Sequence, residues 1–142
     1  MRIVVGSDER TELTDAVIAD LTDRGHELEL VGPLRGGDEQ WAEIGHVVAT
    51  CVADGRAATG VLFCWTGTGA SIAANKVHGA RAALCADAAT AAGARRWNDA
   101  NVLVMSLRAT SVPVAREMLD AWFTTGPDAA ESENIARLER GR

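Results

Sequence analysis

The architecture of this 142-residue chain is clearest in residues 60–69, Gly60-Val61-Leu62-Phe63-Cys64-Trp65-Thr66-Gly67-Thr68-Gly69. Its first half is an uninterrupted apolar run, which is typical of a strand buried inside a sheet. Its second half alternates threonine with glycine ahead of small residues, which is typical of a tight turn into a helix. The sequence therefore predicts a strand over residues 60–64 that leads directly into a helix through Lys76.

The same alternation of short apolar runs and amphipathic segments continues in both directions along the chain. Leu13, Val17 and Leu21 repeat at the spacing of one helix face, and Gly25 follows as a helix terminator. Five strands that alternate with helices predict a single Rossmann-like (flavodoxin-like) α/β sandwich of three layers with a five-stranded parallel sheet. We expect the first strand to lie between the second and third. The other expected strands are 2–6, 26–31, 80–85 and 101–105, and the other expected helices are 41–53, 87–96, 111–123 and 131–139, with a loop over 32–40.

Composition excludes several classes of function. Apolar residues make up 47% of the chain and the formal net charge is −6, which disfavours disorder and binding to nucleic acid or anionic membranes. No apolar run approaches the roughly 20 residues that span a bilayer, and the N-terminus has no signal-peptide pattern. Three cysteines without a CxxC pair, and histidines far apart in sequence, predict a cytoplasmic protein without disulfides or a metal site.

Cys64 is the candidate reactive group. The N–H groups at the start of a helix favour negative charge, so a cysteine there is favoured as a thiolate that acts as base or nucleophile. The same N–H groups can hold an enediolate oxygen. The alternative is an ordinary buried thiol at a strand end. A dinucleotide fingerprint needs glycine where Ile72 stands, and a cysteine phosphatase needs arginine where Ala70 stands.

Several long motifs point to a known family. The runs are Cys64-x-Thr66-Gly67-Thr68-Gly69, Ser71-Ile72-Ala73-Ala74-Asn75-Lys76 and Asn98-Asp99-Ala100-Asn101-Val102, with Gly6-Ser7-Asp8 and Arg108 in addition. In these motifs the chain resembles the ribose-5-phosphate isomerase B and galactose-6-phosphate isomerase family (RpiB/LacAB). The resemblance implies a Rossmann-like sandwich, a homodimer or tetramer with active sites shared between subunits, and no metal or nucleotide.

The resemblance also implies aldose–ketose interconversion through an enediolate. In that reading Cys64 is the catalytic base, Thr66 supports its thiolate, and the turn 67–69 holds the enediolate oxygen. The implied substrate is a small polyhydroxy carbonyl compound. The residues implied to contact it are Asp8, Glu9, Trp41, Trp65, Gly67, Thr68, Gly69, Trp97, Asn98 and Arg108.

The chain departs from the family pattern at the positions that handle the sugar ring and the phosphate. Glu9 stands in place of a substrate-contacting histidine, Trp97 in place of a ring-opening histidine, and Trp65 in place of a glycine. Residues 130–134 replace a phosphate-binding Arg-His-x-x-Arg. Each lost arginine–phosphate contact costs about 1.5–3 kcal/mol. We therefore expect a substrate other than ribose 5-phosphate, one that is open-chain, non-phosphorylated or differently charged.

Two other functions stay open on the sequence alone. The first is related enolate chemistry at Cys64, such as epimerisation, dehydration or a biosynthetic rearrangement. The second is a non-catalytic subunit or binding module of the same fold. Residues 1–142 form one expected domain. Its final helix, within 128–142, carries only Ile135 and Leu138 as large apolar residues, so we expect it to pack on a partner subunit or at the surface.

Overall fold

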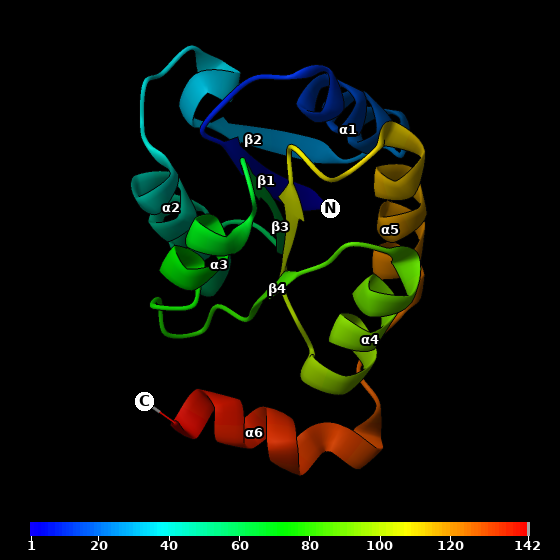
Figure 1. The fold of residues 1–142 in the computed structure, drawn as a ribbon. Coiled ribbons are helices and arrows are strands. Elements are labelled where there is room, and N and C mark those ends of the chain that lie inside the picture. Colours follow the sequence, from blue (N-terminus) through cyan, green and yellow to red (C-terminus); the bar gives the residue numbers. More distant parts are fainter. Residues whose placement is uncertain (142) are drawn as a thin grey trace.

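The computed structural model describes residues 1–141 and contains one parallel sheet of five strands between two layers of helices (Figure 1). The strand order is β2-β1-β3-β5-β4, so the first strand lies between the second and third, as predicted from the sequence. The final residue of the expected C-terminal segment, 142, lies outside the described residues. The strands are β1 (Arg2–Ser7), β2 (Glu27–Val31), β3 (Thr59–Cys64), β4 (Ala82–Leu84) and β5 (Val102–Ser106).

Helices cover both faces of the sheet, which confirms the Rossmann-like sandwich (Figure 1). Helices α2 (Trp41–Ala53) and α3 (Thr68–Ala74) pack together on one face. Helices α1 (Glu12–Asp23), α4 (Ala88–Asn98) and α5 (Val112–Thr124) cover the other. The remaining elements are α6 (Ser132–Arg140) and the 3-10 turns η1 (Gly32–Arg35) and η2 (Ala129–Glu131). Within residues 1–141, no helix has the length and apolarity needed to cross a membrane.

Strand β3 is the buried centre of the sheet. Every residue of β3 is buried, and successive side chains point to opposite faces. Val61 and Phe63 join the core beneath α1, α4 and α5, whereas Leu62 and Cys64 join the core beneath α2 and α3. The strand therefore delivers the Cys64 side chain to the α2–α3 side of the sheet.

Strand β4 is shorter than the expected strand 80–85. The Asn75 amide both donates to the Ala82 carbonyl oxygen at 2.9 Å and accepts from the Ala82 N–H at 2.8 Å. The Asn101 side chain accepts from the Arg81 N–H at 2.7 Å. Asn75 thus bonds both backbone groups of the first strand residue, and Asn101 holds the residue before it. Asn75 also caps α3, which ends before the expected Lys76, and η1 occupies part of the expected loop 32–40.

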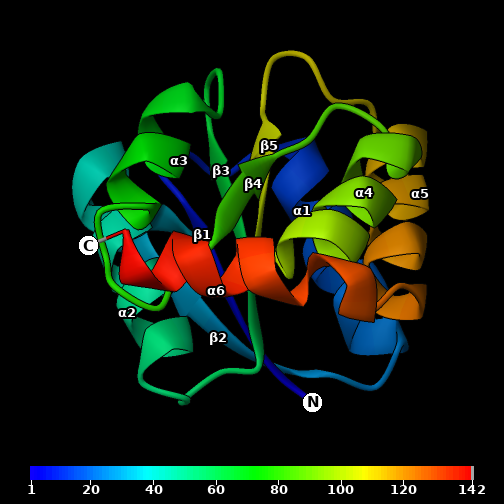
Figure 2. The same ribbon diagram turned by 90° about the horizontal axis from the view of Figure 1, so that it is seen from below.

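Helix α6 crosses the open edge of the sheet at β4 (Figure 2). None of its residues is buried, in keeping with its weak apolar face. It contacts α4, and the Arg81 guanidinium donates to the Glu139 carboxylate at 2.6 Å. Within a single subunit, α6 is therefore a surface helix that lies next to the edge strand β4.

Candidate active site

The turn that follows β3 is shaped by Gly67. This residue has a φ of 80°, which is unfavourable for any residue with a side chain. A Cβ at position 67 would lie 2.5 Å from Leu84 Cδ1 and 3.3 Å from the backbone carbonyl of Met105. Glycine is therefore required both for the direction of the chain and for its close approach to β5.

Backbone hydrogen bonds fasten this turn to the end of β5. The Leu107 N–H donates to the Cys64 carbonyl oxygen at 3.0 Å, and the Arg108 N–H donates to the Trp65 carbonyl oxygen at 3.1 Å. The Ser106 hydroxyl donates to the same Trp65 oxygen at 2.9 Å. The main chain on both sides of the Cys64–Trp65 bond is held in place before any ligand arrives.

Cys64 lies at the carboxyl end of β3 with a relative exposure of 5%. Nearby, the Thr66 and Thr68 hydroxyls share a hydrogen bond of 2.8 Å. A hydroxyl both donates and accepts a hydrogen bond. When the Thr68 hydroxyl is the donor of this pair, the Thr66 O–H is free to donate to a nearby anion. The pair can therefore support negative charge within this turn.

Trp41 forms a wall over the turn. A Cβ at position 69 would lie 2.8 Å from two carbons of the Trp41 ring, so Gly69 and the indole are in direct contact. Trp41 begins α2, which packs tightly on α3 at Gly45. The contact is so close that a Cβ at position 45 would lie 2.9 Å from Ala70 O and from Ala73 Cβ. The sequence marked Trp41 and Gly69 as candidates, and the structure brings them together; Gly45 carried no sequence signal beyond being a glycine inside a helix.

Asp8 emerges beside Cys64. Strand β1 pairs with β3 in a register that places Ser7 opposite Phe63, so the next residues of both strands leave the sheet side by side. The Ser7 hydroxyl donates to the Glu9 carbonyl oxygen at 2.6 Å and accepts from the Glu9 N–H at 3.2 Å. This turn fixes two neighbouring carboxylates. Partial burial, and then the charge of Glu9, raise the pKa of Asp8 above its usual value.

Arg108 faces a cavity of about 320 Å³ at the same edge of the sheet. Its guanidinium lies 5.9 Å from the centre of the Trp65 ring. Leu84 and Thr110, which the sequence reasoning did not select, also line the cavity; their places at or after strand ends were the available signal. The cavity is lined by Thr66, Leu84, Cys85, Ala86, Ser106, Arg108, Ala109 and Thr110.

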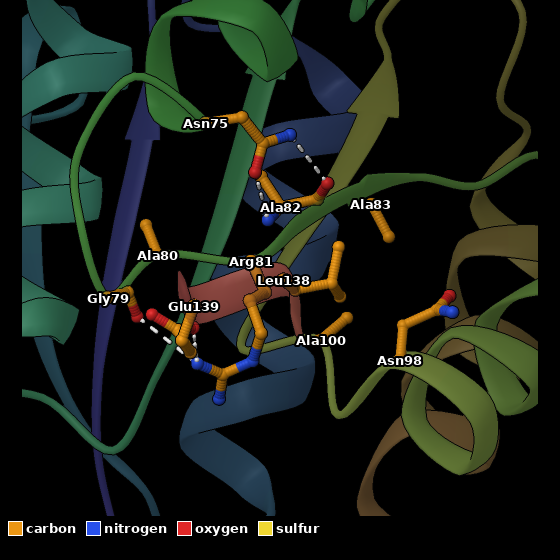
Figure 3. Close-up of a pocket in the computed structure, with 10 residues that line it drawn as sticks. All are labelled: Asn75, Gly79, Ala80, Arg81, Ala82, Ala83, Asn98, Ala100, Leu138 and Glu139. Carbon is orange, nitrogen blue, oxygen red and sulfur yellow. Dashed lines mark hydrogen bonds and ion pairs between the residues drawn. The ribbon is translucent and has the colours of Figure 1, made fainter. Parts of the chain in front are cut away.

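Trp97 and Asn98 do not join this group within one chain. They end α4, next to the start of β5, whereas Cys64 is paired with Ser106 at the other end of that strand. The four residue steps along β5 span about 13 Å. Asn98 instead lines a cavity of about 370 Å³ near α6, where the Arg81 side chain reaches Glu139 (Figure 3). Trp97 is 53% exposed.

In the part of the chain that the structure describes, no three His, Cys, Asp or Glu side chains gather closely enough to hold a metal ion. At the carboxyl ends of β1 and β3, the chain places a thiol, a carboxylate and two hydroxyls, with the Trp41 indole against the glycine turn. These groups can move protons, bind hydroxyls and stabilise an oxyanion.

The chain is similar over almost its whole length to one known family. The family model described as Ribose/Galactose Isomerase matches residues 3–140. The chain belongs to this family. Ribose-5-phosphate isomerase B of Escherichia coli K12 is 34% identical over 134 residues, which cover 92% of this chain and 90% of that protein. D-erythrulose-4-phosphate isomerase of Pectobacterium atrosepticum is 35% identical over 108 residues, which cover 73% of this chain and 71% of that protein.

Solved structures of the ribose/galactose isomerase family share the whole fold. Ribose-5-phosphate isomerase B of Clostridium thermocellum superposes with a TM-score of 0.91 at 32% identity, covering 99% of this chain and 96% of that one. The Mycoplasma genitalium enzyme, solved with bound ribulose-5-phosphate, also gives 0.91, at 28% identity, covering 99% of this chain and 95% of that one. As a member of this family, the protein is a sugar-phosphate isomerase.

Proposed function

We propose that the protein interconverts the aldose and ketose forms of a small open-chain sugar phosphate, with Cys64 as the base. The observation that carries the proposal is the position of Cys64 and Asp8, which leave adjacent strands side by side at a rigid glycine turn. Ligands of open parallel sheets bind beyond the carboxyl ends of the strands. The reactive thiol and a hydroxyl-binding carboxylate therefore lie where a substrate of this fold belongs.

The reaction needs one proton to move between neighbouring carbons. The Cys64 thiolate removes the proton from the hydroxyl-bearing carbon next to the carbonyl, and the electron pair shifts to the carbonyl oxygen to give an enediolate. The thiol then returns the proton to the other carbon, while a hydroxyl proton moves between the two oxygens. The first N–H groups of α3 have no partner within the helix, so they are free to hold the enediolate oxygen. Asp8 binds a substrate hydroxyl, and Trp41 keeps water from the turn.

The substrate class follows from Trp97. This residue occupies the position at which the family resemblance implies a histidine that opens the sugar ring, and an indole N–H is no acid or base for that step. A four-carbon sugar esterified at its terminal oxygen has no hydroxyl with which to close a five-membered ring. Such a tetrose or tetrulose phosphate reaches the enzyme already open. The relative from Pectobacterium atrosepticum is named for a substrate of this class.

The complete site requires a second copy of the chain. Trp97 and Asn98 lie about 13 Å along the sheet from the level of Cys64, on the spacing of strand residues. Both are exposed, so both are available to a neighbouring subunit. A homodimer, or a tetramer built from such dimers, brings the α4 end of one subunit to the Cys64 turn of the other.

Proton exchange in deuterated water tests the proposal. We expect wild-type protein to exchange the α-proton of D-erythrulose 4-phosphate and to convert it to the aldose. Ribose 5-phosphate should be a poor substrate, well below the roughly 10 s⁻¹ of a typical metabolic enzyme. Cys64→Ala should abolish exchange without lowering the melting temperature, and Cys64→Ser should retain little. Cys51→Ala is the matched control because Cys51 is a buried residue in the last turn of α2, at the opposite end of that helix from Trp41; it should cost stability and leave exchange intact.

Two results would contradict the proposal. One is exchange by Cys64→Ala at the wild-type rate, which would show that Cys64 is not the base. The other is turnover of ribose 5-phosphate faster than that of the tetrulose phosphate, which would show that the enzyme does not prefer open-chain substrates.

A further inference from the structure

Trp65 and Arg108 form a pair at the rim of the cavity that holds Thr66. The guanidinium carbon of Arg108 lies 5.9 Å from the Trp65 ring centre, within the range of a cation–π interaction. Trp65 follows Cys64 directly, and Arg108 comes from the loop after β5. The pair therefore joins two loops at the carboxyl edge of the sheet.

Both members of the pair are anchored through their backbones. The Trp65 carbonyl oxygen accepts from the Arg108 N–H at 3.1 Å and from the Ser106 hydroxyl at 2.9 Å. The Ser106 oxygen in turn accepts from the Ala109 N–H at 3.1 Å. The backbone of Trp65 is therefore held in place, and its ring packs against the guanidinium of the flexible Arg108 side chain.

Arg108 is available to an anion. Among residues 1–141, no carboxylate forms an ion pair with its guanidinium, whereas Arg24, Arg81 and Arg95 are each paired with acidic side chains. Arg108 is also the one charged residue among those that line its cavity, beside the hydroxyls of Thr66 and Thr110. A guanidinium with hydroxyls close by is a suitable receptor for a phosphate group.

We infer that Trp65 is a positioning residue that holds Arg108 over the cavity to receive the phosphate group of the substrate; this rests on the proposed function. Segment 130–134 carries Glu131 and Glu133 and no arginine, so the held Arg108 supplies a cationic contact that this segment does not offer to phosphate. Because the cation–π pair limits the conformations of Arg108, less entropy is lost when phosphate binds. Removing the ring should weaken affinity for the phosphate and leave the proton-transfer chemistry at Cys64 in place.

A double-mutant cycle with inorganic phosphate as the probe tests this inference. An exposed cation–π pair is worth about 0.5–1 kcal/mol, so Trp65→Leu should raise the phosphate dissociation constant roughly two- to fivefold. Trp65→Phe, which keeps an aromatic face, should stay within about twofold of wild type. In an Arg108→Gln background, Trp65→Leu should have no further effect. With a sugar phosphate that is turned over, Trp65→Leu should raise KM with little change in kcat.

Matched controls separate this inference from the proposed function. Arg116→Gln removes the same charge from an exposed site on α5 and should leave phosphate affinity unchanged. Cys64→Ala should bind phosphate like wild type. The phosphate dissociation constants of the double-mutant cycle therefore test this inference even if Cys64 is not the base. Equal losses from Trp65→Leu with and without Arg108 would overturn the inference, as would wild-type phosphate affinity in Trp65→Leu or tighter binding of acetate than of phosphate.

Discussion

The indole of Trp41 rests directly on Gly69: a Cβ at position 69 would come within 2.8 Å of the ring carbons Cε3 and Cζ3. Gly69→Ala should therefore push the ring away from the turn and raise KM severalfold. Trp41→Ala should also raise KM, since the wall is lost. The double variant should be no worse than Trp41→Ala alone, because the clash exists only when the ring is present. Steady-state kinetics of the three variants give the comparison, and fully additive losses would argue against this contact.

Asp8 gives a prediction about pH. Its pKa is raised in the folded protein, so the contribution of its protonated form to stability is present below the unfolded value of 3.8 and is lost as pH rises through the folded value. At neutral pH the ionised carboxylate therefore costs stability. Asp8→Asn should raise the melting temperature at pH 7, by an amount that shrinks toward pH 4, while it lowers turnover. Glu117→Gln, a change at an exposed carboxylate on α5, serves as the control and should show neither effect.

The three thiols should differ in their reaction with iodoacetamide. Burial, and then the charge of Asp87, raise the pKa of Cys85 to about 11, and burial followed by the Glu29 carboxylate raises that of Cys51. Both therefore stay protonated at pH 8, and only the thiolate reacts. Peptide mass spectrometry of the folded protein should show Cys64 labelled first. Earlier labelling of Cys85 would mean that its strand end opens more readily than that of β3.

A subunit-mixing experiment tests the shared site. Cys64→Ala and Asn98→Ala should each form an inactive assembly. In mixed dimers one site carries both defects and the other carries neither, so random mixing should restore roughly a quarter of wild-type activity. Coexpression of the two variants, followed by an activity assay and light scattering, provides the measurement. No recovery in a sample that contains mixed dimers would place both residues in the same chain's site, and a monomer by light scattering would rule out sharing altogether.

The existence of the five strands followed from the sequence because each is a short apolar run between amphipathic segments, and the place of β1 between β2 and β3 was also predicted, whereas the order of β5 and β4 was not. Strand β3 was especially clear, since both of its faces are buried and its sequence is apolar throughout. Strand β4 was predicted too long at both ends, since its ladder with β5 covers only Ala82–Leu84 and the Arg81 N–H is bonded to the Asn101 side chain instead. A side-chain hydrogen bond of this kind leaves no trace in the spacing of apolar residues, so the sequence pattern could not show where the strand ends.

The candidate site was only partly visible in the sequence. Position at a strand end was enough to select Cys64 and Asp8, because carboxyl ends of parallel strands share one edge. The pairing of Trp65 with Arg108 depends on two loops that meet in space but are far apart in the chain. The separation of Asn98 from Cys64 required the direction of α4, which carries its last residues back to the opposite edge of the sheet.

Gly45 offers a remote means of reshaping the pocket. Because position 45 has no side chain, α2 touches α3 at this point, and the height of the indole above the turn depends on that spacing. A methyl group added at position 45 would wedge the two helices apart and lift the wall, although it would never touch a substrate. Redesign toward bulkier sugars can thus begin in a helix–helix seam and leave Cys64, the proposed base, and its turn unaltered.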